Sequence, residues 1–205
     1  MKYRAIDEND INCIVKVHIQ CFKGYFLTGL GEKLLYNYYR EFYNENPSLF
    51  IVAENDDKEI IGFVMGMLEN SQARSNFEKN YKTLLFTQLL KMCLKLDPGA
   101  WKRIISRVKS KLSVRKTITS APELPGKFGS LLSIAVLPEY SGQGIGFDLV
   151  MKYEELLVEC KCEYCRLSVQ VNNETAKKLY MKCGYEQYRH NPDGISYKKT
   201  LGVTQ

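Results

Sequence analysis

The spacing of apolar residues predicts helices and strands along the first part of the chain. Residues 2–6 are expected to form a short strand. Apolar side chains then recur every three or four residues as far as Gly24, and this periodicity predicts an amphipathic helix that ends there. A second helix of the same kind is predicted from about Gly31 to the stop signal at residues 46–47, where proline follows asparagine.

Strand patterns dominate the next stretch and return in the last third of the chain. Residues 49–53 and 59–68 are rich in β-branched and aromatic side chains, and an acidic turn separates them, so they predict an antiparallel hairpin. The later patterns predict, in order, a strand at 130–137, a helix at about 144–161, a strand at 164–171, a helix at 173–182 and a hairpin at 185–200.

Length and composition indicate an ordinary globular protein. The 205 residues fit one domain spanning residues 1–205, and 45% hydrophobic with 25% charged residues is typical of a packed core, which excludes a disordered or fibrous protein. No apolar run approaches the roughly 18 to 20 residues of a membrane helix, and the start lacks the apolar region of a signal peptide. We therefore expect a cytoplasmic protein.

The cysteines do not predict a disulfide framework or a metal site. The chain has seven, an odd number, and only Cys160, Cys162 and Cys165 cluster in the sequence. A structural zinc site needs four ligands, and Cys183 is the sole nearby candidate for the fourth. The pattern favours reduced, buried thiols and no bound metal.

Positive charge is concentrated in the middle of the chain. Residues 70–128 hold 13 Lys+Arg and only 3 Asp+Glu. Helices are predicted near 77–96 and 98–112, on either side of a proline-glycine breaker, so we interpret about 70–128 as a basic helical insertion. Three roles stay open: solvated helices that pack on the core, a surface that attracts an anionic acceptor, or a contact with a peripheral membrane surface or nucleic acid. No nucleic-acid motif supports the last of these.

A glycine loop stands between the strand at 130–137 and the helix that follows it. It reads Ser141-Gly142-Gln143-Gly144-Ile145-Gly146. Glycine lets the backbone turn tightly and approach phosphate oxygens, while the free N–H groups and the dipole of the helix start favour an anion. The spacing is neither the dinucleotide fingerprint nor the Walker pattern, which disfavours a nicotinamide or nucleoside-triphosphate ligand.

Two stretches resemble the signatures of the GNAT superfamily of N-acyltransferases. Val136 to Gly146 resembles the acetyl-CoA motif of that family, and Asn173 to Tyr185 resembles its second signature, in the expected order and separation. Ser141 departs from the motif, since the family usually has Arg or Gln there. The resemblance implies an α/β (α+β) fold with a central mixed, mostly antiparallel sheet of six to seven strands, flanked by helices, with the insertion between the third and fourth strands.

The resemblance also implies acetyl-CoA as co-substrate, no metal, and direct transfer of acetyl to an amine. By this resemblance Ala135 and Val136 would offer backbone groups to the pantetheine arm, and residues 141–146 would hold the diphosphate. Asn173 would contact the pantetheine or a nearby backbone group. Tyr180 would protonate the departing thiolate, which a phenol of pKa about 10 can do at neutral pH; the alternative for this residue is a packing role on a helix face.

The sequence does not identify the general base that accepts the proton of the amine. Glu69, at the end of its strand, is the best side-chain candidate. His18 fits an apolar helix face as a core histidine with its hydrogen bonds satisfied, and His190 borders a hairpin turn and is expected to be exposed.

The acceptor and the assembly are the least determined features. A small amine is expected, and the basic insertion favours an anionic one such as an amino sugar or a nucleotide-linked sugar. The alternative function is a non-catalytic acyl-CoA-binding sensor or interaction module. Nucleic acid is disfavoured as a partner, while a peripheral membrane contact through the insertion and a homodimer stay open.

Overall fold

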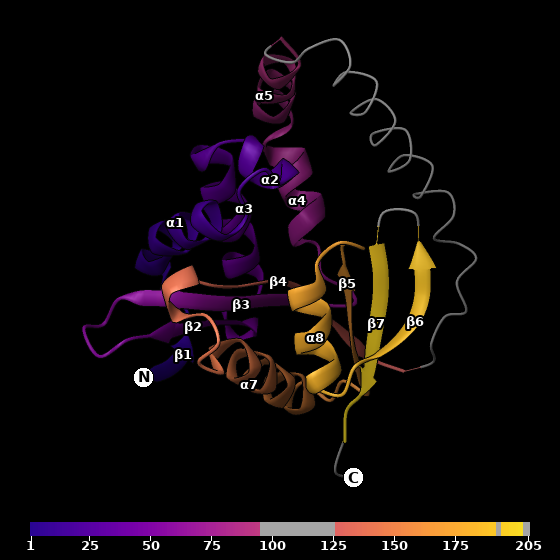
Figure 1. The fold of residues 1–205 in the computed structure, drawn as a ribbon. Coiled ribbons are helices and arrows are strands. Elements are labelled where there is room, and N and C mark those ends of the chain that lie inside the picture. Colours follow the sequence, from indigo (N-terminus) through magenta and orange to yellow (C-terminus); the bar gives the residue numbers. More distant parts are fainter. Residues whose placement is uncertain (95–125, 192–193, 203–205) are drawn as a thin grey trace.

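A computed structural model describes residues 1–94, 126–191 and 194–202, which form one seven-stranded sheet (Figure 1). Its strands are β1 (Lys2–Ala5), β2 (Phe50–Glu54), β3 (Ile60–Leu68), β4 (Phe128–Val136), β5 (Tyr164–Val169), β6 (Glu186–Asn191) and β7 (Gly194–Thr200). They lie in the order β1-β2-β3-β4-β5-β7-β6, with β4 and β5 parallel and the other pairs antiparallel. The expected mixed, mostly antiparallel sheet is confirmed.

Helices connect the strands and cover both faces of the sheet. They are α1 (Ile11–Cys21), α2 (Phe26–Gly29), α3 (Glu32–Glu45), α4 (Ala73–Asn80), α5 (Lys82–Leu94), α7 (Ile145–Glu159) and α8 (Glu174–Lys182), with single 3₁₀ turns η1 (Glu8–Asp10), η2 (Pro47–Leu49) and η4 (Pro138–Tyr140). Most boundaries fall within three residues of those that the sequence pattern predicts, which is the usual accuracy of boundaries predicted from sequence.

The start of the insertion differs from its prediction. In place of one helix over 77–96, α4 begins four residues earlier and α5 follows after a break at Tyr81, where the backbone leaves the helical conformation. The early start has a tertiary cause, because the Glu45 carboxylate on α3 accepts a hydrogen bond from the backbone N–H of Gln72. The helix predicted at 98–112 lies outside the described residues.

The core has two layers, one on each face of the sheet. Phe50 and Val52 of β2 pack with α1 and α3, while their neighbours Ile51 and Ala53 point to the opposite face and pack with α7. Alternation along a strand sends successive side chains to opposite faces, so both faces of β2 are apolar. All four of these side chains are buried.

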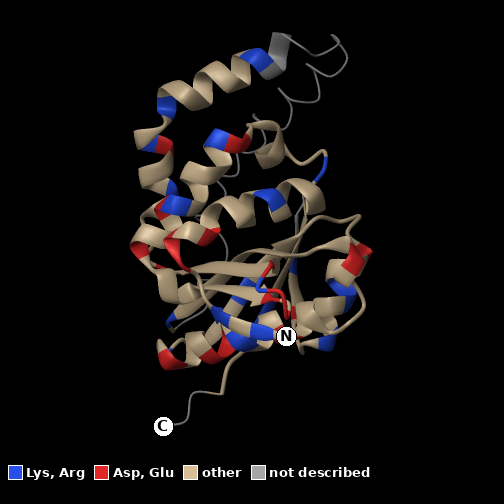
Figure 2. Ribbon diagram, turned by 90° about the vertical axis from the view of Figure 1, so that its left-hand side faces the viewer, with Lys and Arg blue, Asp and Glu red and all other residues tan. Residues whose placement is uncertain are grey.

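Helix α5 extends away from the sheet at the top of Figure 1. It carries Lys82 and Lys91 and no acidic residue (Figure 2). Phe86 and Leu90 are exposed on it. Among the helices in the described part of the chain, none is long and apolar enough to cross a membrane.

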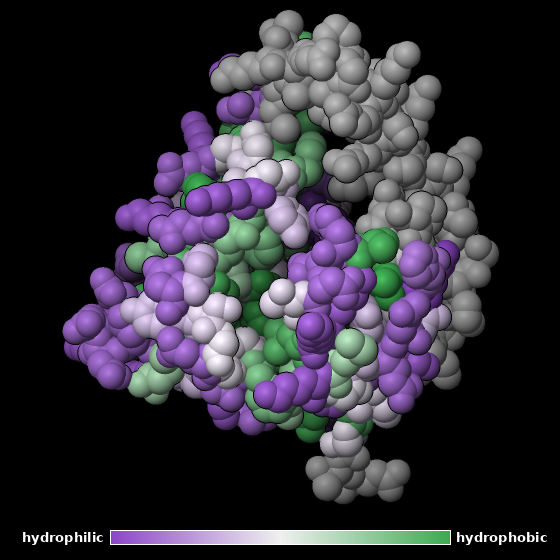
Figure 3. Space-filling model, in the orientation of Figure 1, coloured by the Kyte–Doolittle hydropathy of each residue, from purple (hydrophilic) through white to green (hydrophobic). Residues whose placement is uncertain are grey.

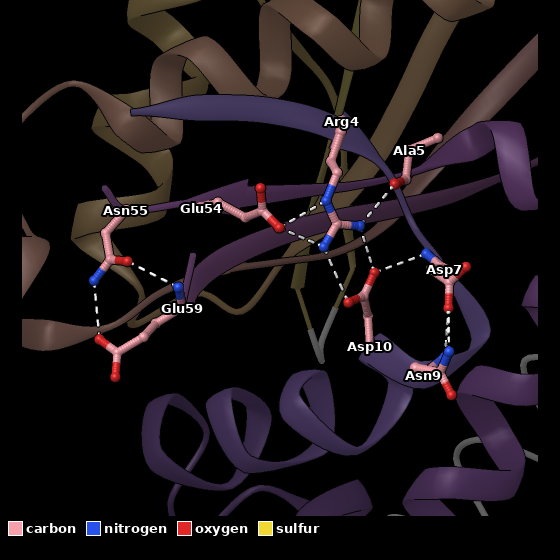
Figure 4. A network of polar contacts seen from close by, with 8 residues as sticks. All are labelled: Arg4, Ala5, Asp7, Asn9, Asp10, Glu54, Asn55 and Glu59. Carbon is pink, nitrogen blue, oxygen red and sulfur yellow. Dashed lines mark hydrogen bonds and ion pairs between the residues drawn. The ribbon is translucent and has the colours of Figure 1, made fainter. Parts of the chain in front are cut away.

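An arginine ties the first strand to its neighbours (Figure 4). The Arg4 guanidinium donates through Nε to Glu54 Oε1 at 2.7 Å and through Nη1 to Asp10 Oδ2 at 2.5 Å. Both carboxylates are largely buried, with 11% and 13% of their side-chain surface exposed. The pair of contacts holds β1, β2 and the start of α1 in one arrangement, since a planar guanidinium binds carboxylates with fixed geometry.

Strand β4 contains one more residue than the part of β3 that it faces. Met65 pairs with Ser133 but the next residue, Gly66, pairs with Leu131, so Leu132 is the extra residue of a β-bulge. A bulge bends its strand and increases the local twist. It therefore turns the second half of β4 away from the line of the first half.

Glycine is required opposite this bulge. A Cβ at Gly66 would overlap the hydroxyl of Tyr153 and come within 2.6 Å of the backbone oxygen of Ser130. Tyr153 is completely buried and cannot move aside. We predict that Gly66→Ala lowers the free energy of unfolding by about 1–3 kcal/mol through overpacking. Urea denaturation measures this, with Gly202→Ala as control because nothing lies within 4 Å of that position; equal stability of the two variants would contradict the prediction.

Candidate functional site

The sheet opens between β4 and β5. These parallel strands pair only through Phe128–Tyr164, Gly129–Cys165 and Ser130–Arg166, and beyond these pairs no ladder joins them. Figure 1 shows β5, β7 and β6 running at a steep angle to β3 and β4. The inner edges of β4 and β5 consequently face a wedge, and their backbone N–H and C=O groups can bind an extended ligand as a strand would.

Ser130 marks the narrow end of the wedge and is held by two other elements. The Tyr153 hydroxyl of α7 donates to its backbone oxygen at 3.0 Å, and Arg166 Nε of β5 donates to its hydroxyl oxygen at 3.0 Å. Both Ser130 and Tyr153 are buried. Well-packed side chains with satisfied hydrogen bonds fix a backbone position, so the point at which the strands separate is set by this serine.

The glycine loop lies at the wide end of the wedge. Gly142 and Gly144 have φ of 80° and 86°, a left-handed conformation that side chains with a Cβ adopt at a cost. Gly144 is the N-cap of α7, and among the described residues no side chain caps this helix start. The first N–H groups of α7 are thus available to an anion, and an added Cβ at either glycine would meet nothing within 4 Å.

The other expected cofactor residues lie around the same wedge. Ala135 and Val136 end β4 beside the loop, and the backbone oxygen of Val136 accepts a hydrogen bond from the Cys21 thiol at 3.3 Å. Asn173 is the N-cap of α8, where its side-chain oxygen accepts from the N–H of Ala176 at 3.1 Å. This structural role leaves the Asn173 amide NH₂ group for another acceptor.

Tyr180 lies on α8, which Figure 1 shows next to β5. The residue is 5% exposed, and its ring packs edge-on against Tyr185, with 5.7 Å between centroids. Burial raises the pKa of Tyr180 above its ordinary value, so the phenol is protonated at neutral pH. The described residues form no hydrogen bond with its hydroxyl. The hydroxyl oxygen is not fully buried. The hydroxyl therefore borders accessible space and can donate a proton.

Figure 3 shows a recess with hydrophobic surface between α8 and the helices α1 to α3. Leu132 and Ile134 of β4 are only partly buried although they are apolar and stand on the wedge. Such surface is typical of a site that excludes water from a bound ligand. Two cavities lie elsewhere in the described part of the chain: one of about 420 Å³ beside Arg4, and one of about 360 Å³ between α7 and the end of β7.

The remaining titratable candidates divide between core and surface. Glu69 is exposed in the turn after β3, and its backbone N–H donates to Phe128, two residues before Ser130. At about 3.3 Å per residue this puts its backbone about 7 Å along the strand from the narrow end of the wedge. His190 is exposed, as expected.

His18 is a core residue, as predicted, but only one of its nitrogens has a partner. The side chain is 4% exposed, and Nδ1 lies 2.6 Å from the Tyr39 hydroxyl. Nε2 is buried with no hydrogen-bond partner among the described residues. Six of the seven cysteines are shown as free thiols: Cys13, Cys21, Cys160, Cys162, Cys165 and Cys183. No group of three or more His, Cys, Asp and Glu in the described ranges could hold a metal ion.

One residue at the narrow end was not among those that the sequence analysis selected. Arg166 of β5 is held beside Ser130 and is partly exposed. The signal was present, because buried Cys165, Leu167 and Val169 alternate along this strand and assign Arg166 to the opposite face. What the sequence lacks is the register that brings this arginine to Ser130.

Comparison with known proteins identifies a family model and a relative that match this chain. Residues 19–185 match the sequence model described as the acetyltransferase (GNAT) family. The chain is 26% identical over 148 residues to the probable N-acetyltransferase HLS1 of Arabidopsis thaliana, a match that covers 70% of this chain but only 28% of that relative.

Solved structures share the fold at low identity. Naa20 of Chaetomium thermophilum, in complex with a bisubstrate analogue, is 20% identical with a TM-score of 0.61, covering 99% of this chain and 88% of that one. The PaiA N-acetyltransferase of Thermoplasma acidophilum, in complex with coenzyme A, is 17% identical with a TM-score of 0.55, covering 97% and 98%. At these identities the likeness establishes the fold.

The buried imidazole predicts a loss of stability in mild acid. Burial lowers the pKa of His18 to about 4 from an ordinary value of 6.5, so the unfolded chain takes up this proton at a higher pH than the folded one. Stability should fall as the pH drops from 6.5 towards 4, by about 2 kcal/mol between pH 7 and pH 5 from this residue. Urea unfolding at both pH values should show a smaller loss for His18→Gln; an equal loss would contradict the account.

The glycine loop predicts a selective loss of cofactor binding. Gly144→Val introduces a branched side chain where the sequence analysis expects the backbone to approach the diphosphate. If the loop holds that group, affinity for CoA falls by about tenfold or more. Gly31→Val is the matched control, because Gly31 is the N-cap of α3, has φ of 90° and also faces open space. Both variants carry backbone strain, and titration calorimetry should show weakened CoA binding only at Gly144. Equal affinity of the Gly144 variant and the wild type would exclude the loop from the site.

Proposed function

Because the chain belongs to the GNAT acetyltransferase family, we propose that it is an acetyl-CoA-dependent N-acetyltransferase that transfers acetyl directly to an amine. One observation carries the proposal: the wedge between β4 and β5 has at its wide end a helix start that no described side chain caps, and Tyr180, a protonated tyrosine, packs behind β5 near its narrow end. These are the two groups that the donor needs, one for its diphosphate and one for its sulfur.

Binding of the donor in this proposal uses backbone more than side chains. The N–H groups of residues 141–146 hold the diphosphate, and the pantetheine arm lies along β4 with hydrogen bonds to Ala135 and Val136. Ser141 lacks the charge that the family usually has at its position, so the backbone and the dipole of α7 supply most of the anion binding. Asn173 contributes its free amide NH₂ to the pantetheine.

The reaction needs one acid and one base. The amine nitrogen attacks the thioester carbonyl, a C–N bond forms, the C–S bond breaks, and the Tyr180 hydroxyl gives its proton to the departing sulfur. The amine loses a proton as it becomes an amide. We propose that the carboxylate of Glu69 accepts it through water, because the backbone of this residue lies about 7 Å from the narrow end of the wedge. The partly apolar recess excludes bulk water, which strengthens the hydrogen bonds through which these two protons are transferred.

The acceptor in this proposal is a small amine, and anionic amines are the first to test. The concentration of positive charge in residues 70–128 supports an anionic acceptor, since it raises the local concentration of such molecules. Phosphorylated or nucleotide-linked amino sugars combine the required amine with that charge. A membrane contact through the same segment is the competing use of this charge.

Tyr180→Phe separates the catalytic role of the tyrosine from a packing role. The substitution keeps the ring and removes only the hydroxyl, so we predict that kcat falls by about 10²- to 10⁴-fold, while the affinity for CoA and the stability change little. Thiol release from acetyl-CoA, followed with a panel of amines, measures kcat.

Tyr185→Phe is the control for this experiment, because the Tyr185 ring packs against Tyr180 and its hydroxyl is buried. It should keep the wild-type rate. A Tyr180→Phe enzyme that turns over as fast as the wild type, under conditions where chemistry limits the rate, would make Tyr180 a packing residue. Binding of acetyl-CoA without turnover of any amine would favour the sensor in place of the enzyme.

A further inference from the structure

Arg166 of β5 has a fixed guanidinium that faces no acidic partner among the residues that the structure describes. Its guanidinium lies 3.8 Å above the ring of Phe128, which in turn stacks on Tyr164 at 5.2 Å between centroids. Nε donates to Ser130 Oγ at 3.0 Å. These two contacts fix the plane of the guanidinium, so its two terminal nitrogens point in set directions.

The terminal nitrogens carry a charge that the described residues leave uncompensated. Arg166 forms no ion pair with any described residue, and its contacts are the hydrogen bond to Ser130 and the stacking on Phe128. An arginine is always charged and offers five N–H donors, of which this arrangement uses one. A fixed, partly buried fork of this kind matches the two oxygens of a carboxylate or a phosphate.

Arg166 lies near Tyr180 at the point where β4 and β5 separate. Arg166 belongs to the last pair before β4 and β5 separate, so it stands at the narrow end of the wedge. The Tyr180 ring packs against Tyr197 of β7, with 6.5 Å between centroids, and Tyr197 pairs with Leu167. Leu167 is the neighbour of Arg166 on β5, and its side chain points to the opposite face of the sheet. Arg166 and Tyr180 therefore flank the narrow end from opposite faces.

We infer that Arg166 binds an oxyanion group, carboxylate or phosphate, of the acceptor amine and so makes the enzyme selective for anionic acceptors. The inference rests on the proposed function, since it assigns the thioester to the narrow end and the donor to the side of Tyr180. The acceptor then approaches from the face of Arg166, and its anionic group meets the guanidinium while its amine reaches the wedge.

The neighbours of Arg166 on that face are mostly compatible with an anion. Lys198 of β7 stands opposite it in the ladder, and Ser168 lies two residues along β5 on the same face, exposed. Glu69 and Glu186 bring negative charge to the surroundings, Glu69 after β3 and Glu186 opposite Lys198 on β6, but neither forms an ion pair with Arg166. The site thus distinguishes anionic from neutral amines by the oriented contact with the Arg166 guanidinium, in addition to the general attraction of anions to positive charge.

The test uses two matched pairs of amines that differ in the anionic group. γ-Aminobutyrate is compared with butylamine, and phosphoethanolamine with ethanolamine, by calorimetry in the presence of CoA and by thiol release from acetyl-CoA. We expect the anionic member of at least one pair to bind about tenfold to a hundredfold more tightly, as charge-assisted hydrogen bonds do. The pair that shows the preference identifies the oxyanion as carboxylate or phosphate.

Variants assign the preference to one residue. Arg166→Gln should abolish it, so that the anionic and the neutral member of each pair bind with equal affinity, while Arg166→Lys, which keeps the charge without the planar fork, should retain part of it. Arg189→Gln removes the same charge two strands away, on β6, and should keep the full preference. A purely structural role of Arg166 would lower the affinity for both members of a pair equally.

Three results would overturn the inference: a wild type without preference in either pair, a preference that survives Arg166→Gln, or an equal loss in Arg189→Gln. Failure of the proposed function gives a different result. In that case no amine is acetylated although CoA binds, and calorimetry still shows whether Arg166 selects the anionic amine.

Discussion

The position of Ser130 is the constraint on which the rest of this structure depends. A tyrosine from α7 holds its backbone oxygen and an arginine from β5 holds its hydroxyl. Directly after it, the bulge at Leu132 turns β4, and the ladder to β5 ends. A parallel sheet would otherwise continue to pair, because unpaired backbone groups inside a protein are costly. The wedge therefore leaves backbone groups of both strands free to bind water or a ligand.

The two ends of the wedge differ in chemistry. At the wide end, Gly142 and Gly144 bring the backbone into a left-handed turn and expose the start of α7, which suits an anion. At the narrow end, the hydroxyl of Tyr180 and the guanidinium of Arg166 lie on opposite faces of β5. An extended donor molecule fits this arrangement if its charged end lies at the wide end of the wedge and its reactive sulfur at the narrow end. The same arrangement separates the proposed approach of the donor from that of the acceptor.

Local signals in the sequence were sufficient for the elements and for the loop. The period of apolar residues placed most helices and strands, and glycine at residues 142 and 144 indicated the turn, because few other residues adopt positive φ. Tyr180 was found through a family signature and not through its own surroundings. Asn173 came from the same signature, and the structure adds that it caps α8.

Features that depend on distant contacts could not be predicted in this way. The early start of α4 is due to Glu45, which is far away in the sequence. The bulge at Leu132 depends on the register with β3, and the role of Arg166 depends on the register with β5. Alternation along a strand shows which face a side chain occupies, but it does not show which residue of the next strand it meets.

A crystal structure of the protein with CoA tests the central claim most directly. The account predicts that the pantetheine arm lies between β4 and β5, with the diphosphate on residues 141–146 and the sulfur beside the hydroxyl of Tyr180. CoA bound with its diphosphate away from the glycine loop, for example in the cavity beside Arg4, or a sulfur remote from Tyr180, would contradict it.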